Sequence, residues 1–458
     1  MFKSYSVVAA VALLTAGALA SEANETARWQ AAIDAAAAQG GGRVTVPAGR
    51  HLVGQLDLRS NVEIHLAEGA VLEGVPGMEN YRVLTLPYSE GTWSAVISAV
   101  GVTNVAVTGK GEVYGNGTAW PQPKDYGGNQ EGLRPRGLFF ADVKGIRLED
   151  FRLRDAACWG IVFKCCDGVV ARRVTIDSHA NANNDGFDIE AKNVLIEDCD
   201  VCCGDDSYCV KSNNPKFVVE NILVRNCVGR SHCNVFKLGT ASHGTMRNIR
   251  FEHCRSANPR RDFIDRRPGK EGRNWYSRHV LPDYPNGLGT SAIVVECVDG
   301  GIVENVVYED IEIAGQWAPI FVRGGTRKGR SCGTPPSDWH VLRNITISNV
   351  RGSCEGDVAS SVSGVEGCIA KNVVLKDIAI ECRGADALRS EKARTAKVVS
   401  RPGGYPEATQ SFGRDALLPA FGLYAEMTEG LKLDNVNFAL RAGAEDKRRP
   451  IVLAASAK

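Results

Sequence analysis

The sequence lacks a net charge of either sign. Its 54 Lys and Arg residues are matched by 53 Asp and Glu residues, which leaves a formal charge of +1. This balance gives no reason to expect a nucleic acid or an anionic membrane surface as a partner. The 458 residues exceed one average domain, but long all-β folds often form a single unit.

Long apolar runs are also missing after the N-terminus. Residues 1–20, MFKSYSVVAAVALLTAGALA, combine Lys3, a short apolar run from Val7 and an Ala-Leu-Ala ending before Ser21. The run is shorter than the roughly 20 residues that span a bilayer. The pattern is typical of a cleaved secretory signal peptide. We therefore expect residues 21–458 to form a secreted or periplasmic catalytic domain that contacts no membrane.

The cysteines do not form a complete set of pairs. All fifteen lie between residues 158 and 382, and in an exported chain an odd number excludes full internal pairing. One position of a repeat holds cysteine in three copies, at Cys199, Cys227 and Cys254, which favours buried, stacked thiols. The adjacent pairs Cys165-Cys166 and Cys202-Cys203 lack the CxxC and histidine partners of a zinc site. The sequence therefore predicts no metal and no cofactor.

Helical periodicity is nearly absent after Ala38, and a repeated phrase takes its place. Examples are VKGIRLEDFRL at 143–153, AKNVLIEDCDV at 191–201 and VENVVYEDIEI at 303–313. Where no insertion intervenes, one asparagine position recurs roughly every 25 to 28 residues: Asn193, Asn221, Asn248, Asn344 and Asn372. Recurrence at this period indicates a solenoid.

Each copy of the phrase alternates and is rich in Val, Ile and Leu, as strands are. Strands of about three to five residues, linked by turns into one coil per repeat, predict an all-β parallel β-helix with a continuous apolar interior. The recurring asparagine is expected at a turn, bonded to its backbone and to its counterparts in adjacent coils. Residues 27–39 indicate a short amphipathic helix that caps the N-terminal coil, whose bare edge would invite aggregation. A core of this size needs no partner to fold, so we expect a monomer.

Two insertions interrupt the period, near 258–290 and 386–418. In solenoids such insertions fall on one face, often the binding face. The first combines arginines with Trp275, Tyr276 and Tyr284, which favours a structured rim. The second fits a solvated loop better. Insertions that close off a cleft into a pocket favour cleavage at the ends of a polysaccharide chain over cleavage within it.

Acidic residues gather in two consecutive repeats, NNDGFDIE at 183–190 and GDDSYCVKS at 204–212. The alternation points Phe187, Ile189, Tyr208 and Val210 inward and leaves Asp188, Glu190, Ser207, Cys209 and Lys211 outward. Asp185, Asp205 and Asp206 then lie on turns just before the strands. Because coils stack about 4.8 Å apart, the three carboxylates converge on one patch.

Three uses of such a patch stay open. An inverting glycoside hydrolase pairs a protonated acid with a carboxylate that activates water, roughly 6.5 to 9.5 Å away. Calcium also prefers clustered oxygens. Solvated turn acids with no function are the third possibility.

The two acidic motifs resemble the NTDG and GDD motifs of glycoside hydrolase family 28, the polygalacturonase family. The similarity extends from VTVPAGRHLVGQLDLRSNVEIHLAEGAVLEG at 44–74 to APIFVRGG at 318–325. The resemblance implies a right-handed parallel β-helix and inverting hydrolysis. It also implies that Asp205 is the general acid and that Asp185 and Asp206 hold and activate the water.

The sequence departs from this family at two motifs. In SHCNVFKLGT, His232 comes two residues early relative to Leu238-Gly239, and Lys237 takes an outward place that usually holds a small residue. The Arg-Ile-Lys motif, which grips the galacturonate carboxylate in the family, aligns best with SAIVVECVDGG and places Glu296 at the lysine position. A galacturonate there would lose a bidentate arginine contact and meet a like charge.

Two interpretations of these departures stay open. In one, Lys211 and Lys237 stack on adjacent coils and bind a uronate, as Arg323 or the arginine-rich insertion also would. In the other, Lys211, Lys237, Glu190 and Glu296 form a structural charge ladder and the catalytic subsite takes a neutral sugar. The candidate substrate-binding residues are accordingly His232, Lys211, Lys237, Glu296 and Arg323.

Three functions follow from these residues. The first is an exported inverting hydrolase of a pectin-like or other acidic polysaccharide. The second is a polysaccharide lyase on the same scaffold that uses calcium and a Lys or Arg base. The third is a glycan-binding relative that has lost catalysis.

Overall fold

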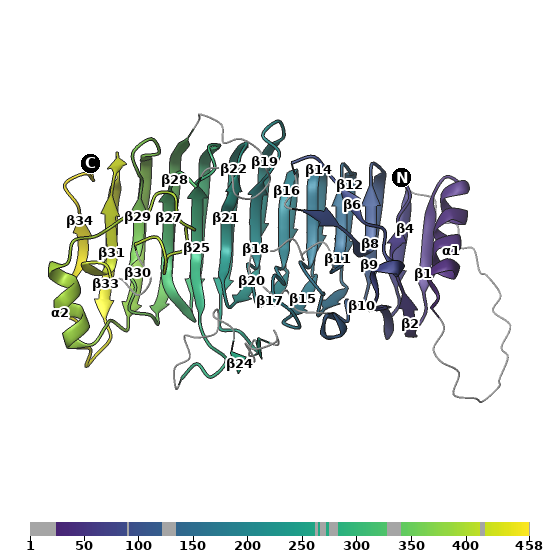
Figure 1. Ribbon diagram of the computed structural model, residues 1–458, viewed down its shortest axis with the longest axis horizontal. Coiled ribbons are helices and arrows are strands. Elements are labelled where there is room, and N and C mark those ends of the chain that lie inside the picture. Colours follow the sequence, from purple (N-terminus) through teal and green to yellow (C-terminus); the bar gives the residue numbers. More distant parts are fainter. Residues whose placement is uncertain are drawn as a thin grey trace.

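The computed structural model describes residues 24–88, 91–120, 134–261, 264–265, 272–273, 283–327, 340–412 and 417–457. The predicted signal peptide and most of the arginine-rich insertion, with Trp275 and Tyr276, lie outside these residues. Thirty strands form one continuous sheet with parallel pairing throughout. The sheet winds into an elongated right-handed β-helix, with the N- and C-terminal coils at opposite ends (Figure 1). The predicted fold class is confirmed.

The coils stack their strands into three faces. The first face contains β1 (Gly42–Val46), β4 (Val62–Leu66), β9 (Thr103–Gly109), β12 (Lys144–Glu149), β14 (Ile161–Arg172), β16 (Phe187–Glu197), β19 (Val218–Arg225), β22 (Thr245–Ser256), β26 (Ile302–Ile313), β28 (Val341–Cys354), β30 (Ala370–Cys382) and β33 (Lys432–Leu440). The second contains β2 (Gly49–Val53), β5 (Ala70–Gly74), β10 (Glu112–Tyr114), β13 (Arg152–Arg154), β15 (Thr175–Ser178), β17 (Asp200–Cys203) and β20 (Val228–Ser231), and continues in the ends of the long strands from β22 onward.

The third face carries the functional residues. It contains the starts of β14 and β16 together with β3 (Leu56–Asp57), β8 (Ala95–Val100), β11 (Arg136–Ala141), β18 (Tyr208–Ser212), β21 (Asn234–Ser242), β25 (Gly289–Cys297), β27 (Gln316–Gly324), β29 (Ser360–Ser363), β31 (Ala420–Glu426) and β34 (Arg449–Leu453). Smaller elements are β32 (Thr428–Glu429), two 3₁₀ turns, η1 (Met78–Asn80) and η2 (Gly117–Ala119), and two antiparallel pairs, β6 (Leu84–Thr85) with β7 (Thr92–Trp93) and β23 (Ile264–Asp265) with β24 (Gly272–Arg273).

Helices lie at both ends of the solenoid (Figure 1). Helix α1 (Thr26–Ala38) buries Trp29 and Ile33 against the first coil, which confirms the predicted N-terminal cap. Helix α2 (Ala387–Thr395) begins at Asp386, whose carboxylate accepts the Arg389 backbone N–H at 2.9 Å. The interpretation of 386–418 as a solvated loop was therefore wrong. The helix is capped by a side chain, which is how a short helix satisfies its first N–H groups.

The recurring asparagines form a ladder along one edge. The described members have φ between 51° and 57°, a left-handed conformation that asparagine tolerates well: Asn193, Asn221, Asn248, Asn305, Asn344 and Asn372. Each side-chain amide donates to the side-chain oxygen of the preceding coil, at 3.1 Å from Asn221 to Asn193 and 3.0 Å from Asn344 to Asn305. The predicted coil-to-coil bonding is confirmed and Asn305 extends the series, but the asparagines lie within strands and not at turns between them.

Many strands have the three to five residues predicted, as β4 and β18 do, but others are much longer. Strand β28 has 14 residues and β30 has 13. Arg343 pairs with Lys371 and Ile345 pairs with Val373, on either side of Asn344. A single left-handed residue bends the chain without ending the hydrogen-bonded ladder, so one strand supplies two faces.

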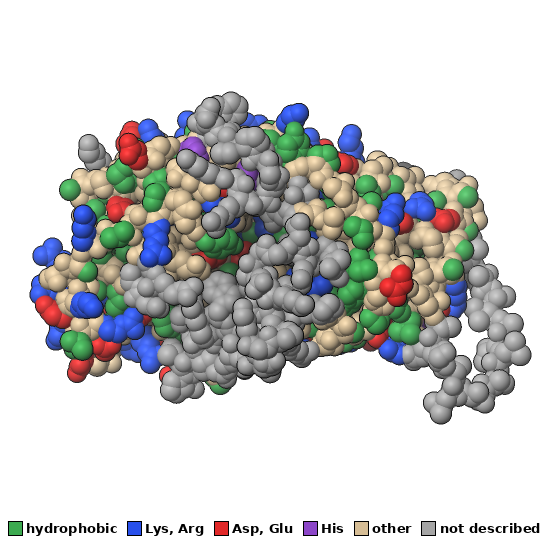
Figure 2. Space-filling model, in the orientation of Figure 1, with side chains coloured by type: hydrophobic (Ala, Val, Ile, Leu, Met, Phe, Trp, Pro, Cys, Tyr) green, Lys and Arg blue, Asp and Glu red, His purple; other side chains and the backbone are tan. Residues whose placement is uncertain are grey.

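The interior is a continuous apolar stack. The rings of Phe187, Tyr208 and Phe236 follow one another at centroid separations of 5.7 and 5.6 Å. Cys199 and Cys227 are buried and free, as predicted for stacked thiols. On the outer surface, basic and acidic side chains are interspersed toward both ends of the solenoid (Figure 2). Among the described residues, neither helix has the length and apolar character that crossing a membrane requires.

Candidate active site

The three aspartates occupy the turns that lead from the second face to the third. Asp185 lies two residues before β16, and Asp205 and Asp206 lie just before β18. Phe187, Ile189, Tyr208 and Val210 all belong to the core, so the predicted alternation is confirmed. The carboxylates therefore project outward from adjacent coils, as expected.

Close contact between the two turns depends on Gly186. Its N–H donates to the Asp206 carbonyl at 2.8 Å. A Cβ at this position would lie 2.4 Å from the Ser207 carbonyl oxygen, so any side chain would push the coils apart. The glycine of the NNDG motif thus brings Asp185 beside the Asp205-Asp206 pair.

Asp206 is held by positive charge and by amide hydrogen bonds. The Lys237 Nζ lies 2.9 Å from Oδ2, and the Asn234 side-chain amide donates to Oδ1 at 2.9 Å. Burial would raise the pKa of Asp206, but Lys237, Lys211 and these hydrogen bonds together hold it below its ordinary value. Asp206 is therefore ionised at neutral pH.

Asp185 has the opposite tendency. Burial, followed by the charges of Asp188 and Asp205, raises its pKa well above the ordinary value. Lys211 opposes this rise only in part, because its Nζ is 3.6 Å from Asp185 but 2.7 Å from Asp188. Neighbouring carboxylates with different affinities for a proton are what acid–base catalysis needs.

Lys211, like Lys237, is a predicted binding residue that lies beside the carboxylates. Its Nζ lies 3.8 Å from the centroid of the Trp159 ring, and its side chain keeps 11% exposure. The sequence interpretation did not single out Trp159. An aromatic ring with an ammonium over its face forms a cation–π contact that fixes the lysine in place.

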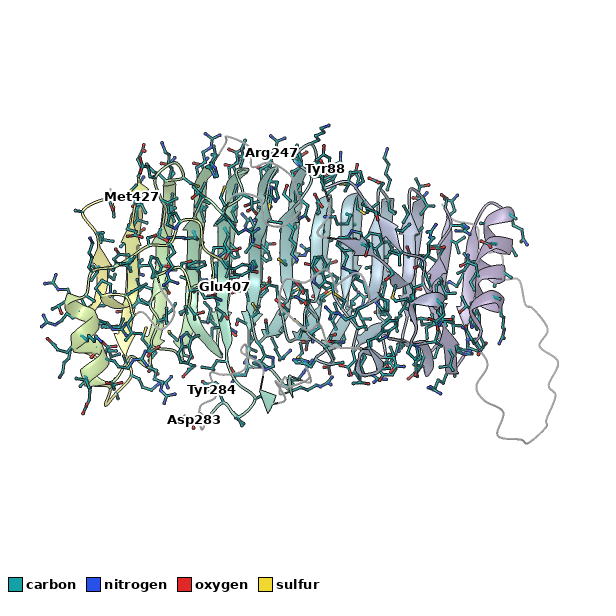
Figure 3. The ribbon with its side chains drawn as sticks, viewed as in Figure 1. Tyr88, Arg247, Asp283, Tyr284, Glu407 and Met427 are labelled. Atoms are coloured by element: carbon teal, nitrogen blue, oxygen red, sulfur yellow. The ribbon has the colours of Figure 1, made fainter. Side chains whose placement is uncertain are left out.

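The second insertion supplies an acid that the sequence interpretation missed. Glu407 accepts from the Asn234 amide at 3.2 Å and lies 3.4 Å from the Lys237 Nζ. It sits near the middle of the solenoid's length (Figure 3), although it is 170 residues from Lys237 in the chain. Burial raises the pKa of Glu407, and Lys237 opposes that rise. No local sequence feature distinguishes this acid from the other acids of its segment.

Two candidate binding residues, Glu296 and Arg323, are buried. Glu296 has no exposed surface, and burial raises its pKa well above the ordinary value. Arg323 donates to the hydroxyls of Ser363 at 3.0 Å and Ser400 at 2.8 Å and stacks on Phe412. Its burial lowers its pKa to about 10. We therefore correct their assignment as substrate contacts, because both side chains are buried and the insertion that was interpreted as a loop packs against Arg323.

His232 is buried as well. Its ring has no exposed surface, and its Nε2–H donates to the Asn286 carbonyl at 2.8 Å. Burial and the nearby His179 lower its pKa to about 3, so it is neutral. The two-residue displacement in the sequence leaves His232 just after β20, before the outward-facing strand begins.

The two lysines are not stacked as expected. Lys237 pairs in register with Cys209, two residues before Lys211. Lys237, 1% exposed, lies among Asp206, Glu407 and, at 3.9 Å, Glu296. Glu190 instead pairs with Lys164 on the preceding coil. The four residues of the predicted charge ladder therefore fall into three ion-pair groups, of which only one, that of Lys237 and Glu296, contains two of them.

Whether the aspartate cluster could bind calcium can be judged from its ligand atoms. Oxygens of Asp205 and Asp206 and the Cys233 sulfur lie within 4.8 Å of one another. Calcium takes six to eight oxygen ligands and disfavours thiols. The Lys237 ammonium already contacts Asp206. This donor set does not fit calcium.

A family model described as glycosyl hydrolases family 28 matches residues 38–260 and 292–400. The chain belongs to this family. Both acidic motifs fall within the first matched segment. The match also covers Glu296 and Arg323, so the corrected residues lie inside the family's common scaffold.

Relatives of this family 28 member are distant. A probable polygalacturonase of Vitis vinifera is 25% identical over 233 residues, which is 47% of each chain. The chain thus spans about half the length of this curated relative. An exopolygalacturonase of Thermotoga maritima superposes with a TM-score of 0.61 at 20% identity, covering 90% of this chain and 88% of that one. An endo-xylogalacturonan hydrolase of Aspergillus tubingensis gives 0.53 at 14% identity, covering 97% and 98%. These likenesses establish the fold.

Proposed function

We propose that this family 28 protein hydrolyses a glycosidic bond of a pectin-like or other acidic polysaccharide with inversion of configuration. One observation carries the proposal: carboxylates that converge from adjacent coils differ in proton affinity, with Asp206 held ionised by Lys237 and Asp185 disposed to keep a proton. Inverting hydrolysis needs a protonated acid and an ionised base across the scissile bond. Oxygens of Asp205 and Asp206 lie within 4.8 Å of one another, below the roughly 6.5 to 9.5 Å usual for an inverting pair, so the configuration of the product decides between inversion and retention.

The role of Asp205 follows from the resemblance of its motif to that of family 28, and the role of Asp206 follows from its charge state. Asp205 protonates the leaving oxygen, and Asp206 takes the proton of the attacking water. Asp185, whose pKa is raised in part by the charge of Asp205, holds the attacking water together with Asp206. Lys211 neutralises Asp185 and Asp188 before a substrate arrives.

The buried cations favour a neutral sugar in the catalytic subsite. Lys237 is enclosed by acids, and Arg323 by hydroxyls and Phe412. Neither side chain is therefore available to bind the carboxylate of a uronate. Lys211 already has two carboxylate partners. We propose that the acidic residues of the polymer bind in neighbouring subsites and that the reaction attacks chain ends.

The deciding experiment incubates the mature chain with pectic, rhamnogalacturonan, xylogalacturonan and algal oligosaccharides. We expect new reducing ends whose anomeric configuration, followed by NMR, is inverted. Asp205→Asn should lower turnover by about 10³-fold or more, because the leaving oxygen loses its proton donor. Asp198→Asn, on a turn of the same coil away from the cleft, is the matched control and should retain turnover.

Other outcomes separate the alternatives. An unsaturated, ultraviolet-absorbing product would identify a lyase. Saturable binding without new reducing ends would identify a non-catalytic glycan-binding protein. Unchanged turnover in Asp205→Asn would remove this residue from the mechanism.

We also propose that the protein is exported. Residues 1–20 are proposed to be a cleaved signal peptide that delivers a monomeric enzyme to the periplasm or the exterior. N-terminal sequencing of the secreted protein checks the cleavage before Ser21.

A further inference from the structure

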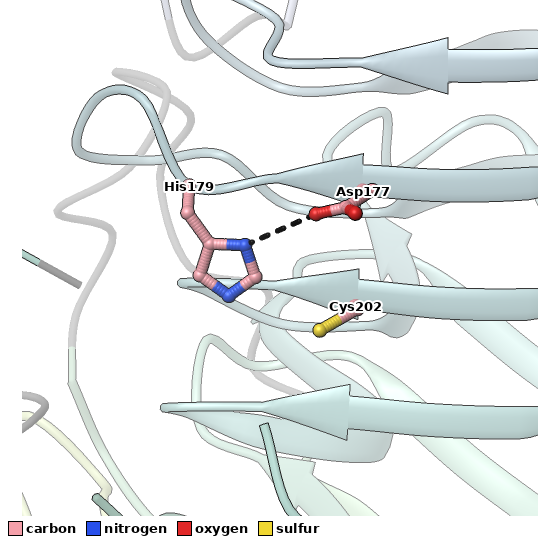
Figure 4. A group of neighbouring side chains, drawn as sticks. All are labelled: Asp177, His179 and Cys202. Carbon is pink, nitrogen blue, oxygen red and sulfur yellow. Dashed lines mark ion pairs between the residues drawn. The ribbon is translucent and has the colours of Figure 1, made fainter. Parts of the chain in front are cut away.

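A second cluster of chemically active side chains lies outside the carboxylate site. Asp177 in β15, His179 in the following turn and Cys202 in β17 come from adjacent coils (Figure 4). One oxygen, one ring nitrogen and the sulfur lie within 4.8 Å of one another. The sequence interpretation looked for CxxC motifs and missed this group, because its histidine and its cysteine come together only when the coils stack.

The environment of the His179 ring is the main evidence that this cluster binds a ligand. Its side chain is 1% exposed, and neither ring nitrogen has a hydrogen-bond partner in the described structure. Nδ1 points toward Asp177 (Figure 4), but the 3.7 Å separation is too long for a hydrogen bond. A buried imidazole with both nitrogens unsatisfied is costly, so such a group in a native protein calls for an explanation.

We propose that Asp177, His179 and Cys202 bind a divalent transition metal ion, with Zn²⁺ as the best match. The donors are a carboxylate, an imidazole and a thiolate, which is the mixed set that zinc accepts. Ligands about 2.0–2.3 Å from a tetrahedral ion lie about 3.3–3.6 Å from one another. The 3.7 Å between Asp177 and His179 is close to that spacing and requires only a small contraction.

The surroundings support these three ligands, and the fourth position of a tetrahedral ion would be left to water. Arg261 donates to one oxygen of Asp177 at 3.0 Å and Arg152 to the other at 3.0 Å. Each carboxylate oxygen keeps a further lone pair for a metal, and outer hydrogen bonds of this kind orient ligands. The Arg260 backbone N–H points to the Cys202 sulfur at 3.4 Å. Carboxylate and thiolate together supply two negative charges, which match a divalent ion.

The position gives the ion a structural consequence. His179 begins the turn that ends at Asp185, and Cys202 lies just before the turn that carries Asp205 and Asp206. An ion shared by His179 and Cys202 would join the starts of these two turns. The inference does not depend on the roles proposed for the aspartates, and its test reads the metal rather than turnover.

The test uses the full mature chain, dialysed against a chelator and titrated with Co²⁺. We expect one Co²⁺ per chain and a thiolate-to-cobalt charge-transfer band in the near ultraviolet. Zn²⁺ should displace the cobalt, abolish the band and raise the Tm of the chelator-treated protein. Cys202→Ser should remove the band, and His179→Gln should weaken Co²⁺ binding by at least about 100-fold.

Cys203→Ser is the matched control. Cys203 is the next residue, but its side chain faces the core and its thiol donates to the Asp205 carbonyl. The band should persist in this variant. If Cys202→Ser does not fold, His179→Gln and the wild-type titration decide the question. No charge-transfer band in the wild type, or an undiminished band in Cys202→Ser, would overturn the proposal and leave a metal-free imidazole–thiol pair.

Discussion

Residues one coil apart hold opposite charge states in this protein. Asp206 is stabilised as a carboxylate by Lys237, whereas burial and like charges work against ionisation of Asp185. The difference does not come from the amino acid, which is aspartate in both cases. It comes from which lysine each side chain meets and how many carboxylates stand around it.

Replacing Asp185 should stabilise the fold while harming activity. A carboxyl with a raised folded pKa binds protons more strongly in the native state, so its contribution to stability falls as pH rises above the ordinary value of 3.8. Asp185→Asn should therefore raise the Tm at pH 7 by about 2–4 °C. The gain should vanish below about pH 4. Calorimetry across this range checks the sign, and a Tm that falls at pH 7 would contradict the assigned pKa direction.

Removing Lys237 should act in the opposite direction. Lys237→Met leaves Asp206 buried without its main counter-charge, which costs about 3–5 kcal/mol. Because the pKa of Asp206 then rises, the acid limb of the pH–rate profile should move to higher pH. Glu407→Gln keeps the 2.9 Å pair of Lys237 and Asp206 and should leave that limb in place. An unmoved limb in Lys237→Met would mean that another group sets it.

Part of the site could be predicted from the sequence. The outward direction of Asp185, Asp205 and Asp206 follows from local alternation, and their convergence follows from the coil period. The burial of Glu296 and Arg323 could not be predicted, because it depends on contacts made far apart in the sequence, including those of a segment that folds back from the far end of the solenoid. Glu407 was missed for the same reason: contacts across 170 residues leave no periodic signal.

At the scale of elements, the asparagine ladder determines how strands become faces. Its left-handed residues turn the chain while pairing continues on both sides. The sequence predicted the ladder from its period but not the unbroken strands. Nothing in the period distinguishes a bend within a strand from a turn between two strands.

Two substitutions separate the roles of backbone and side chain in this ladder. Asn248 has φ of 56° and bonds to Asn221 and Asn305. Asn248→Val should cost about 2–3 kcal/mol, because a β-branched residue is strained there and the ladder bonds are lost. Asn248→Gly removes only the bonds and should cost about 1 kcal/mol. Urea denaturation measures both, and equal losses would show that backbone strain contributes nothing.

For the whole molecule, the ends of the stack matter as much as its interior. Helix α1 covers the first coil with Trp29 and Ile33. Ile33→Asp should lift this cap and expose unpaired strand edges, which promote association. Light scattering at rising protein concentration should show aggregation of this variant. Ala31→Asp, on the exposed side of the same helix, should stay monodisperse, and aggregation of both would point to the added charge instead.

The coil-by-coil connectivity has a mechanical consequence. The first and last coils lie at opposite ends of the long axis (Figure 1), and each coil pairs only with its immediate neighbours. A force applied between the termini therefore loads one inter-coil interface at a time. A peeled coil of about 25 residues releases about 8–9 nm of chain. The protein should therefore lengthen in a series of small steps, one coil at a time. The coil that carries Lys237 should unfold after its neighbours, because the second insertion binds it through Glu407.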